Sequence, residues 1–448
     1  MDNRTIFALS TVYGKSGVAV IRISGKNAIK AVEQLSDINI DNIKPRYAYF
    51  TKIYEIGKSD TIDNALLLYF KAPHSFNGED IVEIQSHGSK AVIAQILDNL
   101  GKIKGFRTAE PGEFSKRAFY NGKMDLTQAE GLADLIDAET KEQQRYAVRQ
   151  MEGNLRNLYA SWRESLVKVL AHLEAYIDFP DENIPDDVCI KLLNTVFKVE
   201  KEIEEYLSDN KNSERIRDGF KIVIIGRPNA GKSSLINAIV KRDAVIVSDI
   251  AGTTRDAIDL HFDLGGYPLI ITDTAGLRDK TNDIIEAKGI EIARQKIKDA
   301  DLIFALYDAQ IEDKSVFTDI IKESENNVLY IANKCDKLTN EQCSNIKKTS
   351  DAAISAKNNL GIDNLLSKTL CYIKQNFSVG NSAVITRQRY REALVEAVEN
   401  LKQFNLDKDI ELAAEDIRMA VRAIGKITGK VEVEEILDKI FGDFCIGK

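Results

Sequence analysis

The sequence predicts a multi-domain protein of mixed α/β and α class. Roughly the first 120 residues combine alternating and apolar runs broken by glycines, which indicates a mixed α/β domain. Between residues 126 and 207 apolar side chains recur with a helical period, and from residue 220 strand-like and helical segments alternate. The helical pattern returns after residue 375, so we expect a doubly wound parallel-sheet domain inserted into a helical domain.

The expected domain boundaries follow these changes of pattern. Residues 1–120 form the N-terminal domain and residues 218–374 form the inserted domain. The helical domain is then built from residues 121–217 and residues 375–448.

The elements expected in the first half of the chain follow in order. Residues 18–23 and 65–70 have the apolar character of strands, and residues 91–100 have that of a helix. A helical stripe follows, which residues 178–181 end because proline cannot continue a helix. The stripe consists of Trp162, Leu166, Val169, Leu173, Tyr176 and Ile177.

The inserted domain is expected to contain five strands, at 221–225, 269–272, 302–306, 328–332 and 352–354. Helical segments separate most of them, which is typical of a parallel sheet. Two apolar stripes beyond residue 375 predict further helices. They are Ala413, Ile417, Ala420, Val421 and Ile424, and then Val433, Ile436, Leu437, Ile440 and Phe441.

Composition excludes several classes of protein. Charged residues make up 29% and hydrophobic residues 44% of 448 residues, a globular balance. No apolar run is long enough to span a membrane, and the first residues lack the apolar core of a signal peptide. Five cysteines without framework spacing suit a reducing, cytoplasmic location. A net charge of −8 means that an RNA partner needs a local basic face.

Residues 226–233, Gly-Arg-Pro-Asn-Ala-Gly-Lys-Ser, form a complete phosphate loop. An apolar run precedes the loop and a helical segment follows it, so backbone N–H groups and a helix N-terminus converge on phosphate oxygens. Lys232 is expected to reach the β- and γ-phosphates, and the Ser233 hydroxyl to ligate Mg²⁺. The alternative, an ordinary glycine-rich turn, does not account for this context.

Two further motifs indicate a guanine nucleotide. Asp273 ends a strand-like run, where a carboxylate can hold Mg²⁺ through water. Asp336, in Asn-Lys-Cys-Asp, can accept hydrogen bonds from guanine N1–H and the 2-amino group, and adenine offers neither donor there. The four-residue match alone is weak, but its place after a strand and before residues 355–357 makes it specific.

Leu277 stands where many GTPases carry a glutamine that orients the attacking water. Three residues are candidates for a substitute. Asn229 could help to hold a monovalent cation, Arg255 could act as an arginine finger, and Glu286 could polarise a water. For Arg255 and Glu286 a solvated loop charge is an equal alternative.

The motifs, taken with segments outside the inserted domain, resemble the MnmE (TrmE) family of tRNA-modification GTPases. The resemblance lies in the phosphate loop with Asn229, residues 252–256 and 273–277, and the terminal Phe-Cys-Ile-Gly-Lys. Residues 21–25, 78–83 and 111–126 resemble the N-terminal folate domain of the family. The resemblance covers essentially the whole chain.

The resemblance implies a potassium-stimulated GTP hydrolase that works with an FAD-dependent partner protein of the MnmG type. The pair adds an aminomethyl or carboxymethylaminomethyl group to C5 of the wobble uridine of certain tRNAs. The carbon comes from a reduced folate, 5-formyl- or 5,10-methylene-tetrahydrofolate. A homodimer forms through the N-terminal folate-binding domain, and it joins the partner in a heterotetramer or a larger complex.

The resemblance also assigns roles by position. Folate contacts fall on Arg22, Glu83, Lys123 and Lys448, and ordinary surface charge is the alternative for each alone. Potassium ligands fall on Asn229, Ser248, Ile250 and Thr253; magnesium ligands fall on Ser233 and Thr254. Ser248 replaces a threonine of some members but keeps the hydroxyl. Catalytic roles fall on Lys232, Glu286, Cys445 and, as a candidate finger, Arg255.

The full set of expected GTP contacts is Asn229, Ala230, Gly231, Lys232, Ser233, Ser234, Ser248, Asp249, Ile250, Ala251, Gly252, Thr253, Thr254, Asp273, Thr274, Ala275, Gly276, Asn333, Lys334, Asp336, Ser355, Ala356 and Lys357.

Cys445 is expected to be chemically active. A cysteine three residues from the last position of the sequence is rarely part of a core, and a nearby ammonium such as Lys448 favours its thiolate. Attack at uridine C6 and activation of a folate carbon both remain open, as does a tail thiol without a role. The other four cysteines look incidental, and four scattered histidines give no metal-ligand spacing.

A second function class remains open on the nucleotide motifs alone: a regulatory or ribosome-assembly switch that binds rather than transfers groups. The terminal thiol and the Arg22, Glu83 and Lys123 set favour the enzyme. A basic helical face for tRNA, or simply a solvated face, is given by Arg387, Arg389, Arg391, Arg418, Arg422, Lys426 and Lys430.

Overall fold

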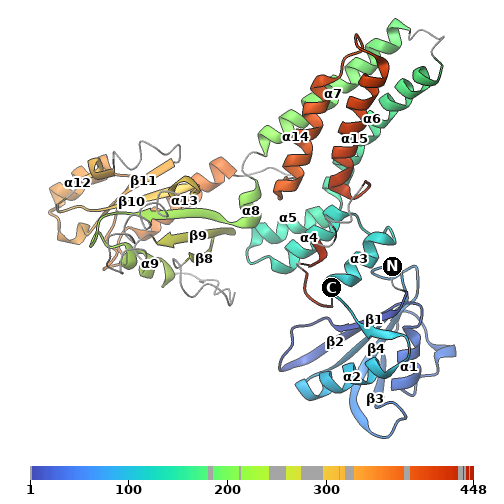
Figure 1. The fold of residues 1–448 in the computed structure, drawn as a ribbon. Coiled ribbons are helices and arrows are strands. Elements are labelled where there is room, and N and C mark those ends of the chain that lie inside the picture. Colours follow the sequence, from blue (N-terminus) through green and yellow to red (C-terminus); the bar gives the residue numbers. More distant parts are fainter. Residues whose placement is uncertain are drawn as a thin grey trace, which may run out of the picture. The chain divides into compact units, whose positions relative to one another are not determined.

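The structure, a computed structural model, describes residues 3–179, 185–210, 213–241, 259–273, 296–311, 313–317, 327–377, 384–431, 437, 440–442 and 444–447. The chain forms two compact units (Figure 1). One comprises residues 1–133, 156–167 and 418–448, and the other comprises residues 134–155 and 168–417. This division does not test the four expected boundaries, which stay a prediction.

A six-stranded sheet forms the N-terminal part of the first unit, in the order β3-β4-β5-β2-β1-β6. Only the β1–β6 pair is parallel among its neighbours. Its strands are β1 (Thr5–Leu9), β2 (Ser16–Ser24), β3 (Tyr49–Tyr54), β4 (Thr61–Phe70), β5 (Ile81–Gly88) and β6 (Phe106–Thr108). The two predicted strands lie within β2 and β4. The other four escaped prediction because β1 and β6 are short and β3 and β5 mix polar residues into their runs.

Helices α1 (Ile29–Leu35) and α2 (Lys90–Lys102) pack on this sheet. The predicted helix at 91–100 lies inside α2, which Ser89 caps through its side-chain oxygen. The shared core includes Ile21, Ile84 and Ile96, all fully buried. Helix α3 (Glu113–Tyr120) follows β6.

The predicted helical segments are confirmed as α4 (Leu126–Asp137), α5 (Lys141–Met151), α6 (Asn154–Asp178), α7 (Asp186–Asp209), α14 (Gln388–Gln403) and α15 (Ile410–Thr428). Helix α6 ends at residue 178, as predicted. The stripe residues Trp162, Leu166, Val169 and Leu173 are buried, and Tyr176 and Ile177 are partly buried. All five stripe residues of α15 are buried. In the second predicted stripe, Leu437 and Phe441 are buried, and Val433 and Ile436 lie outside the described residues.

The second sheet has the order β12-β11-β10-β7-β9-β8. Its strands are β7 (Phe220–Ile225), β8 (Asp259–Leu264), β9 (Tyr267–Asp273), β10 (Leu302–Asp308), β11 (Asn327–Asn333) and β12 (Ala352–Ala353). The five predicted strands are found and their pairs are parallel. Edge strand β8, antiparallel to β9, was missed, although its polar and apolar residues alternate.

Helices cover both faces of this sheet, as a doubly wound fold requires. Ile222 and Ile224 of β7 face a cluster that includes side chains of α9 (Lys232–Val240) and α13 (Ile362–Phe377). The intervening Val223 and Ile225 face the other cluster, against which Ile346 of α12 (Asn340–Thr349) packs. Among the described residues, none of the helices combines the length and the apolar character needed to cross a membrane.

Candidate functional site

The nucleotide motifs that lie within the described residues are found at one edge of the second sheet. Strands β7, β9, β10 and β11 are mutually parallel, so their carboxyl ends share that edge. The phosphate loop follows β7, and Asp273 is the last residue of β9. Asp308 and Asn333 end β10 and β11 and are register partners. The fold therefore collects motifs that lie far apart in the sequence.

The phosphate loop has the backbone that its motif requires. Gly231 caps α9 with φ 100°, and a Cβ there would lie 2.2 Å from Asn333 Nδ2, so only glycine fits. Asn229 also has a left-handed φ of 64°, which asparagine tolerates better than most residues. The Lys232 ammonium is buried and donates to the carbonyl oxygens of Gly226 at 2.8 Å and Arg227 at 3.3 Å. The loop is thus closed around its lysine.

One buried side chain, Asn333, joins three of the motifs. Its Nδ2 donates to the Ala230 carbonyl at 2.7 Å, and its Oδ1 accepts from the Ala356 N–H at 3.0 Å. Asn333 is 2% exposed, so neither contact is shared with bulk water. The residue therefore fixes the phosphate loop relative to the loop at 355–357.

We expect Asn333→Ala to destabilise the chain by about 2–4 kcal/mol, because it leaves a buried carbonyl and a buried N–H without partners. The affinity for GTP should fall with it, because the two loops lose their common tie. Thermal unfolding and binding of a fluorescent GTP analogue measure both effects. Asn345→Ala, at an exposed position of α12, is the control and should change neither by a measurable amount.

The rest of the Asn-Lys-Cys-Asp motif has distinct environments. The Lys334 ammonium donates to Asp308 Oδ2 at 2.7 Å. Burial alone would raise the pKa of Asp308, but this hydrogen bond holds that pKa below its usual value. Burial, and then the Cys343 thiol, raise the pKa of Cys335 to about 11, so this thiol is inert at neutral pH. Asp336 is exposed, with its carboxylate available to a ligand.

The described GTP candidates differ in burial, with Gly231 and Lys334 partly buried. Ala230, Lys232, Asn333, Ser355 and Ala356 are buried, whereas Asn229, Ser233, Ser234, Asp336 and Lys357 are exposed. The side chain of Asp273 is not described. The following candidates lie outside the described residues: Ser248, Asp249, Ile250, Ala251, Gly252, Thr253, Thr254, Arg255, Thr274, Ala275, Gly276, Leu277, Glu286 and Lys448.

The N-terminal sheet holds a second polar cluster. Arg22 of β2 and Glu83 of β5 are register partners, and Arg22 Nε donates to Glu83 Oε1 at 2.9 Å. The Arg22 guanidinium lies 5.6 Å from the ring centre of Phe76 and 5.8 Å from that of Phe114. Two of the folate candidates therefore touch, beside two aromatic rings that the sequence did not single out. Lys123 is exposed, and its side chain lies against Gly78.

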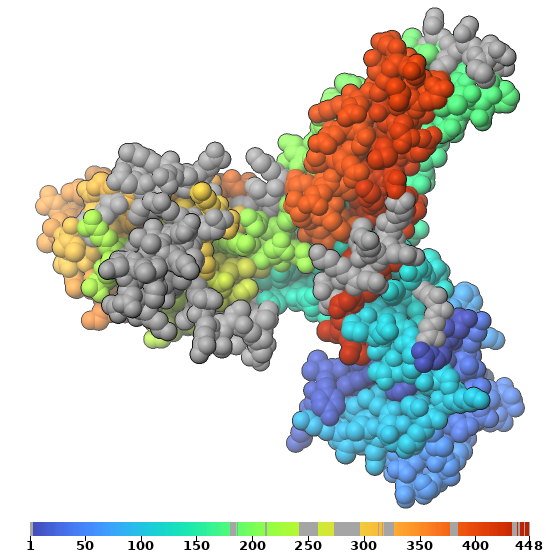
Figure 2. Space-filling view, in the orientation of Figure 1, coloured from blue at the N-terminus to red at the C-terminus, as the bar shows by residue number. Residues whose placement is uncertain are grey.

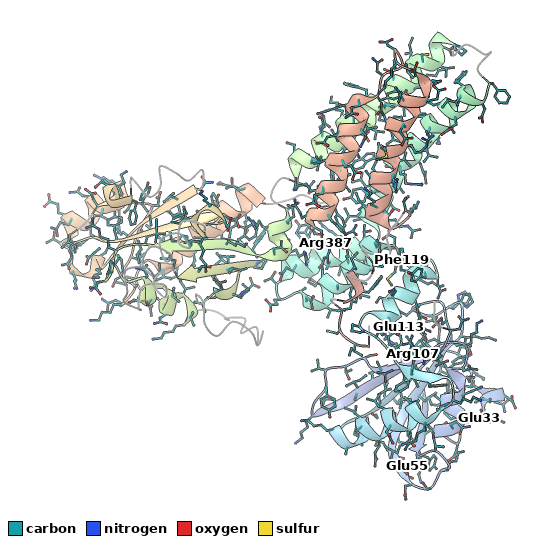
Figure 3. All side chains as sticks on the ribbon, in the orientation of Figure 1. Glu33, Glu55, Arg107, Glu113, Phe119 and Arg387 are labelled. Carbon is teal, nitrogen blue, oxygen red and sulfur yellow. The ribbon has the colours of Figure 1, made fainter. Side chains whose placement is uncertain are left out.

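A buried ion network holds this region in place. Arg117 of α3 pairs with Glu79 at 3.1 Å and with Glu113 at 2.9 Å. Arg107 pairs with Glu113 at 2.6 Å, and both residues are labelled in Figure 3. Burial opposes the charge on Glu113, but hydrogen bonds from both arginines hold its pKa below the usual value. Glu79, Glu113 and Arg117 belong to segments that carry the family resemblance, whereas Arg107 lies outside them. In the structure their charges fasten α3 to the sheet.

The terminal Phe-Cys-Ile-Gly segment is docked within the same unit, beside Leu9, Ser10 and Pro111. In Figure 2 the red atoms near the C-terminus lie against the cyan part of this unit. The Phe444 ring is 5.5 Å from that of Phe441, and Ile446 forms a β-bridge with Pro111. Gly447 has φ 98°, a Cβ there would lie 2.2 Å from the Leu9 carbonyl oxygen, and its own carbonyl accepts from the Ser10 hydroxyl at 2.9 Å. Cys445, between these contacts, is exposed.

The proposed basic face is partly wrong. Arg387 is an ion-pair partner of Asp134 at 2.7 Å, and Arg391 pairs with Glu214 at 2.7 Å. Their side chains are 18% and 21% exposed. These arginines hold elements of the second unit together, and partly buried acids favour arginine for its fixed fork of donors.

This fold and site define a P-loop GTPase. The family model of the MnmE helical domain matches residues 126–445, and that of the GTP-binding protein TrmE N-terminus matches residues 5–123. The tRNA modification GTPase MnmE of Rickettsia bellii (strain RML369-C) is 48% identical over 446 residues, which cover 99% of this chain and 100% of the relative. The relative of the same name from Rickettsia typhi is also 48% identical over 446 residues. Among solved structures, the G domain of T. maritima FeoB aligns at 22% identity and a TM-score of 0.26, covering 34% of this chain and 98% of that one.

The chain belongs to the MnmE (TrmE) family of tRNA modification GTPases. The expected resemblance is therefore confirmed along almost the whole chain.

Proposed function

We propose that this chain, a GTP hydrolase acting in tRNA modification, is stimulated by potassium and uses a reduced folate to modify the wobble uridine of certain tRNAs. An FAD-dependent partner of the MnmG type completes the reaction, which adds an aminomethyl or carboxymethylaminomethyl group at C5. The reaction takes place in the cytoplasm. GTP hydrolysis requires Mg²⁺, with Ser233 and Thr254 as ligands and Asp273 acting through water.

The observation that carries the GTP half of this proposal is the Asn333 bridge. A nucleotide held at both ends needs its phosphate loop and base loop at a fixed separation, and one buried amide joins them. Asp336, exposed beyond that bridge, accepts the guanine donors. Lys232 stabilises charge on the β- and γ-phosphates, and Glu286 polarises the attacking water.

Potassium stimulation should depend on the Asn229 side chain, because a bound K⁺ supplies the charge that an arginine finger supplies elsewhere. Asn229, Ser248, Ile250 and Thr253 are its ligands. At constant ionic strength we expect initial rates of GTP hydrolysis in KCl to exceed those in NaCl by at least about 10-fold. Equal rates in the two salts would remove the potassium role.

Asn229→Gly is the informative variant, because glycine keeps the left-handed backbone at φ 64° while the amide is lost. It should reduce kcat in KCl toward the NaCl rate and leave nucleotide affinity nearly unchanged, as expected for a contact made mainly in the transition state. Asn229→Ala should do the same with an added cost of backbone strain. A loss confined to affinity contradicts the assignment.

The folate half of the proposal is supported by the Arg22–Glu83 pair beside two rings. A pterin is flat, offers an amino group and a ring N–H to a carboxylate, and stacks on aromatic side chains. Glu83 accepts from those donors, while Arg22, Lys123 and Lys448 bind the polar or anionic parts. The terminal segment bridges to Pro111, three positions before the Phe114 ring that flanks Arg22, so the thiol of Cys445 lies in the same unit as this pair.

Reconstitution tests the whole proposal. The chain, an FAD-loaded partner, GTP, K⁺ and tetrahydrofolate carrying a ¹³C one-carbon unit are incubated with unmodified tRNA. Mass spectrometry of the nucleosides should find the label in the wobble uridine. GTP turnover with no labelled nucleoside would instead favour a regulatory switch, the other function class open to this site.

The homodimer should form through the N-terminal domain whether or not nucleotide is present, while the GTPase domains close on each other only with GTP-like ligands. Switch loops held by the γ-phosphate have two such states. Sedimentation of the nucleotide-free chain at micromolar concentration should give a dimer. A monomer there rules out the constitutive contact, and the heterotetramer or larger complex with the partner would need another explanation.

A further inference from the structure

Helix α5 is fastened to the hairpin made by β8 and β9. The Glu142 N–H donates to the Gly266 carbonyl, in the hairpin turn, at 3.0 Å. Tyr146, also on α5, is 7% exposed and belongs to the core cluster that contains Tyr267 of β9. Figure 1 shows α5 next to α8 (Glu214–Asp218) and to the start of β9. Helix α5 therefore packs against the GTPase sheet at the turn of the β8–β9 hairpin.

The hairpin is a stiff connection between α5 and the proposed nucleotide loops. Its strands pair continuously from Asp259↔Thr272 to Leu264↔Tyr267, a length of about 17 Å at ~3.4 Å per residue. The Thr272 hydroxyl donates to Asp259 Oδ1 at 2.5 Å, at the end nearest those loops. A displacement at that end therefore reaches the turn.

Helix α5 also borders a cavity of about 160 Å³. From α5 it is lined by Tyr146, Ala147 and Gln150, and from α8 by Ile216 and Arg217. Polar side chains span it: Gln143 Nε2 donates to the Arg217 carbonyl at 3.0 Å. The cavity opens to solvent beside the exposed residues Arg217 and Asp218, and it leaves room next to α5 for the helix to shift.

Both segments that join the GTPase sheet to the helical part converge on this cavity. Asp134 Oδ1 accepts from Arg217 of α8 at 3.1 Å and from Arg387 at 2.7 Å. The Thr386 hydroxyl donates to Gln150 Oε1 at 3.2 Å. Gln150 in turn donates to the Tyr390 hydroxyl of α14 at 3.1 Å, which ties α5 to the helical bundle.

We propose that α5 positions the helical bundle according to the bound nucleotide. The β8–β9 hairpin carries the movement of the nucleotide loops to α5, and α5 shifts into the cavity toward α8 while its contact with the turn at Gly266 is kept. This inference deepens the proposed function and rests on it for the role of the loops that flank the hairpin. It assigns to α5 a positioning role and no contact with substrate.

Filling the cavity tests the movement. Ala147 is 3% exposed, and Ala147→Leu places three further carbons in the cavity. Hydrogen exchange of residues 141–151 in the wild-type chain should differ between GDP and a non-hydrolysable GTP analogue. In Ala147→Leu that difference should be lost, while K⁺-dependent GTP hydrolysis stays within about twofold of wild type because the nucleotide contacts are untouched. A rise in Tm of about 2–4 °C would show that the cavity is filled.

Two further variants keep the test decisive. Ala147→Val fills less of the cavity and should lose part of the exchange difference; it also serves if leucine prevents folding. Gln144→Leu introduces the same leucine side chain at an exposed position of α5 and should behave as wild type. An unchanged exchange difference in a Tm-raised Ala147→Leu overturns the proposal. In reconstitution, the amount of labelled uridine formed per GTP hydrolysed should fall at least fivefold in Ala147→Leu. If the wild-type chain forms no labelled uridine, the proposed function is contradicted. The hydrogen-exchange result then still tests the role of α5.

A disulfide tests the contact that should be kept. A Cβ built at Gly266 lies 3.6 Å from Lys141 Cβ, within the range that a disulfide spans. The double variant Lys141→Cys, Gly266→Cys is compared in its oxidised and reduced forms, because any side chain at Gly266, φ 96°, is strained in both. Nucleotide-dependent hydrogen exchange is also expected in α14, which Gln150 ties to α5, and the oxidised form should keep it. Loss of that exchange on oxidation, restored by a reductant, shows that the turn and α5 must separate and overturns the proposal.

Discussion

Cys445→Ser should reduce formation of the modified wobble uridine by at least about 100-fold, because a serine hydroxyl near neutral pH is a far weaker nucleophile than a partly ionised thiol. The same variant should bind GTP and hydrolyse it with K⁺ stimulation like the wild type. The nucleotide motifs occupy residues 226–357, and Cys445 is exposed on a segment docked against Pro111 and Leu9. The substitution is nearly isosteric and leaves that docking intact.

The measurement pairs phosphate release with nucleoside mass spectrometry of tRNA incubated with the FAD partner, folate and GTP. Cys371→Ser is the matched control, because Cys371 is the other exposed cysteine among the described residues. It should modify tRNA at the wild-type rate. If Cys445→Ser does so too, the thiol has no chemical role. The segment is then a docking element, and Lys448 is the next residue to vary.

Asp336→Asn should weaken GTP binding by about 30- to 1000-fold, because a carboxylate that accepts two guanine donors is replaced by an amide that accepts one and opposes the other. Its backbone and its exposed position should not change. The new amide can donate to the C2 carbonyl of xanthine, so xanthosine triphosphate should bind the variant better than GTP does.

Titration with fluorescent guanosine and xanthosine nucleotides measures whether the variant now prefers xanthine to guanine. Asp363→Asn, at an exposed acid in the first turn of α13, removes the same charge away from the motif and should leave both affinities unchanged. Equal weakening for both bases would mean that Asp336 supports the loop rather than reads the base. In that case tRNA modification, which is expected to depend on Cys445, should still proceed at saturating GTP.

Much of the nucleotide site could be predicted because its requirements are local. A phosphate loop needs Gly231 for a left-handed cap and Lys232 directly after it, and both residues can be recognised in the sequence. The same holds for the helical stripes, since burial of Ala413 or Ile424 follows from spacing along one helix. The strand β8 was missed because it lies at an edge, where half-buried residues weaken the apolar signal.

The contacts that join distant segments could not be read in this way. Nothing local marks Asp308 as the partner of Lys334, or Ser10 as the partner of Gly447, because each pairing depends on which strand ends meet. The sequence placed Arg387 and Arg391 on a basic surface, but in the structure they form ion pairs with Asp134 and Glu214. Charge in a sequence does not reveal its partner.

By itself, the sequence determined the doubly wound sheet, the helical stripes, the order of the nucleotide motifs and the family. These are set by periodicity and by short motifs whose backbone geometry their own residues dictate. Only the tertiary structure decided that Asn333 ties two loops and that Arg22 meets Glu83 beside two aromatic rings. It also decided that the terminal segment rests on the end of β1 and that α5 borders a cavity next to the GTPase sheet. The physical reason is that such contacts depend on chain closure over tens to hundreds of residues, which no local propensity encodes.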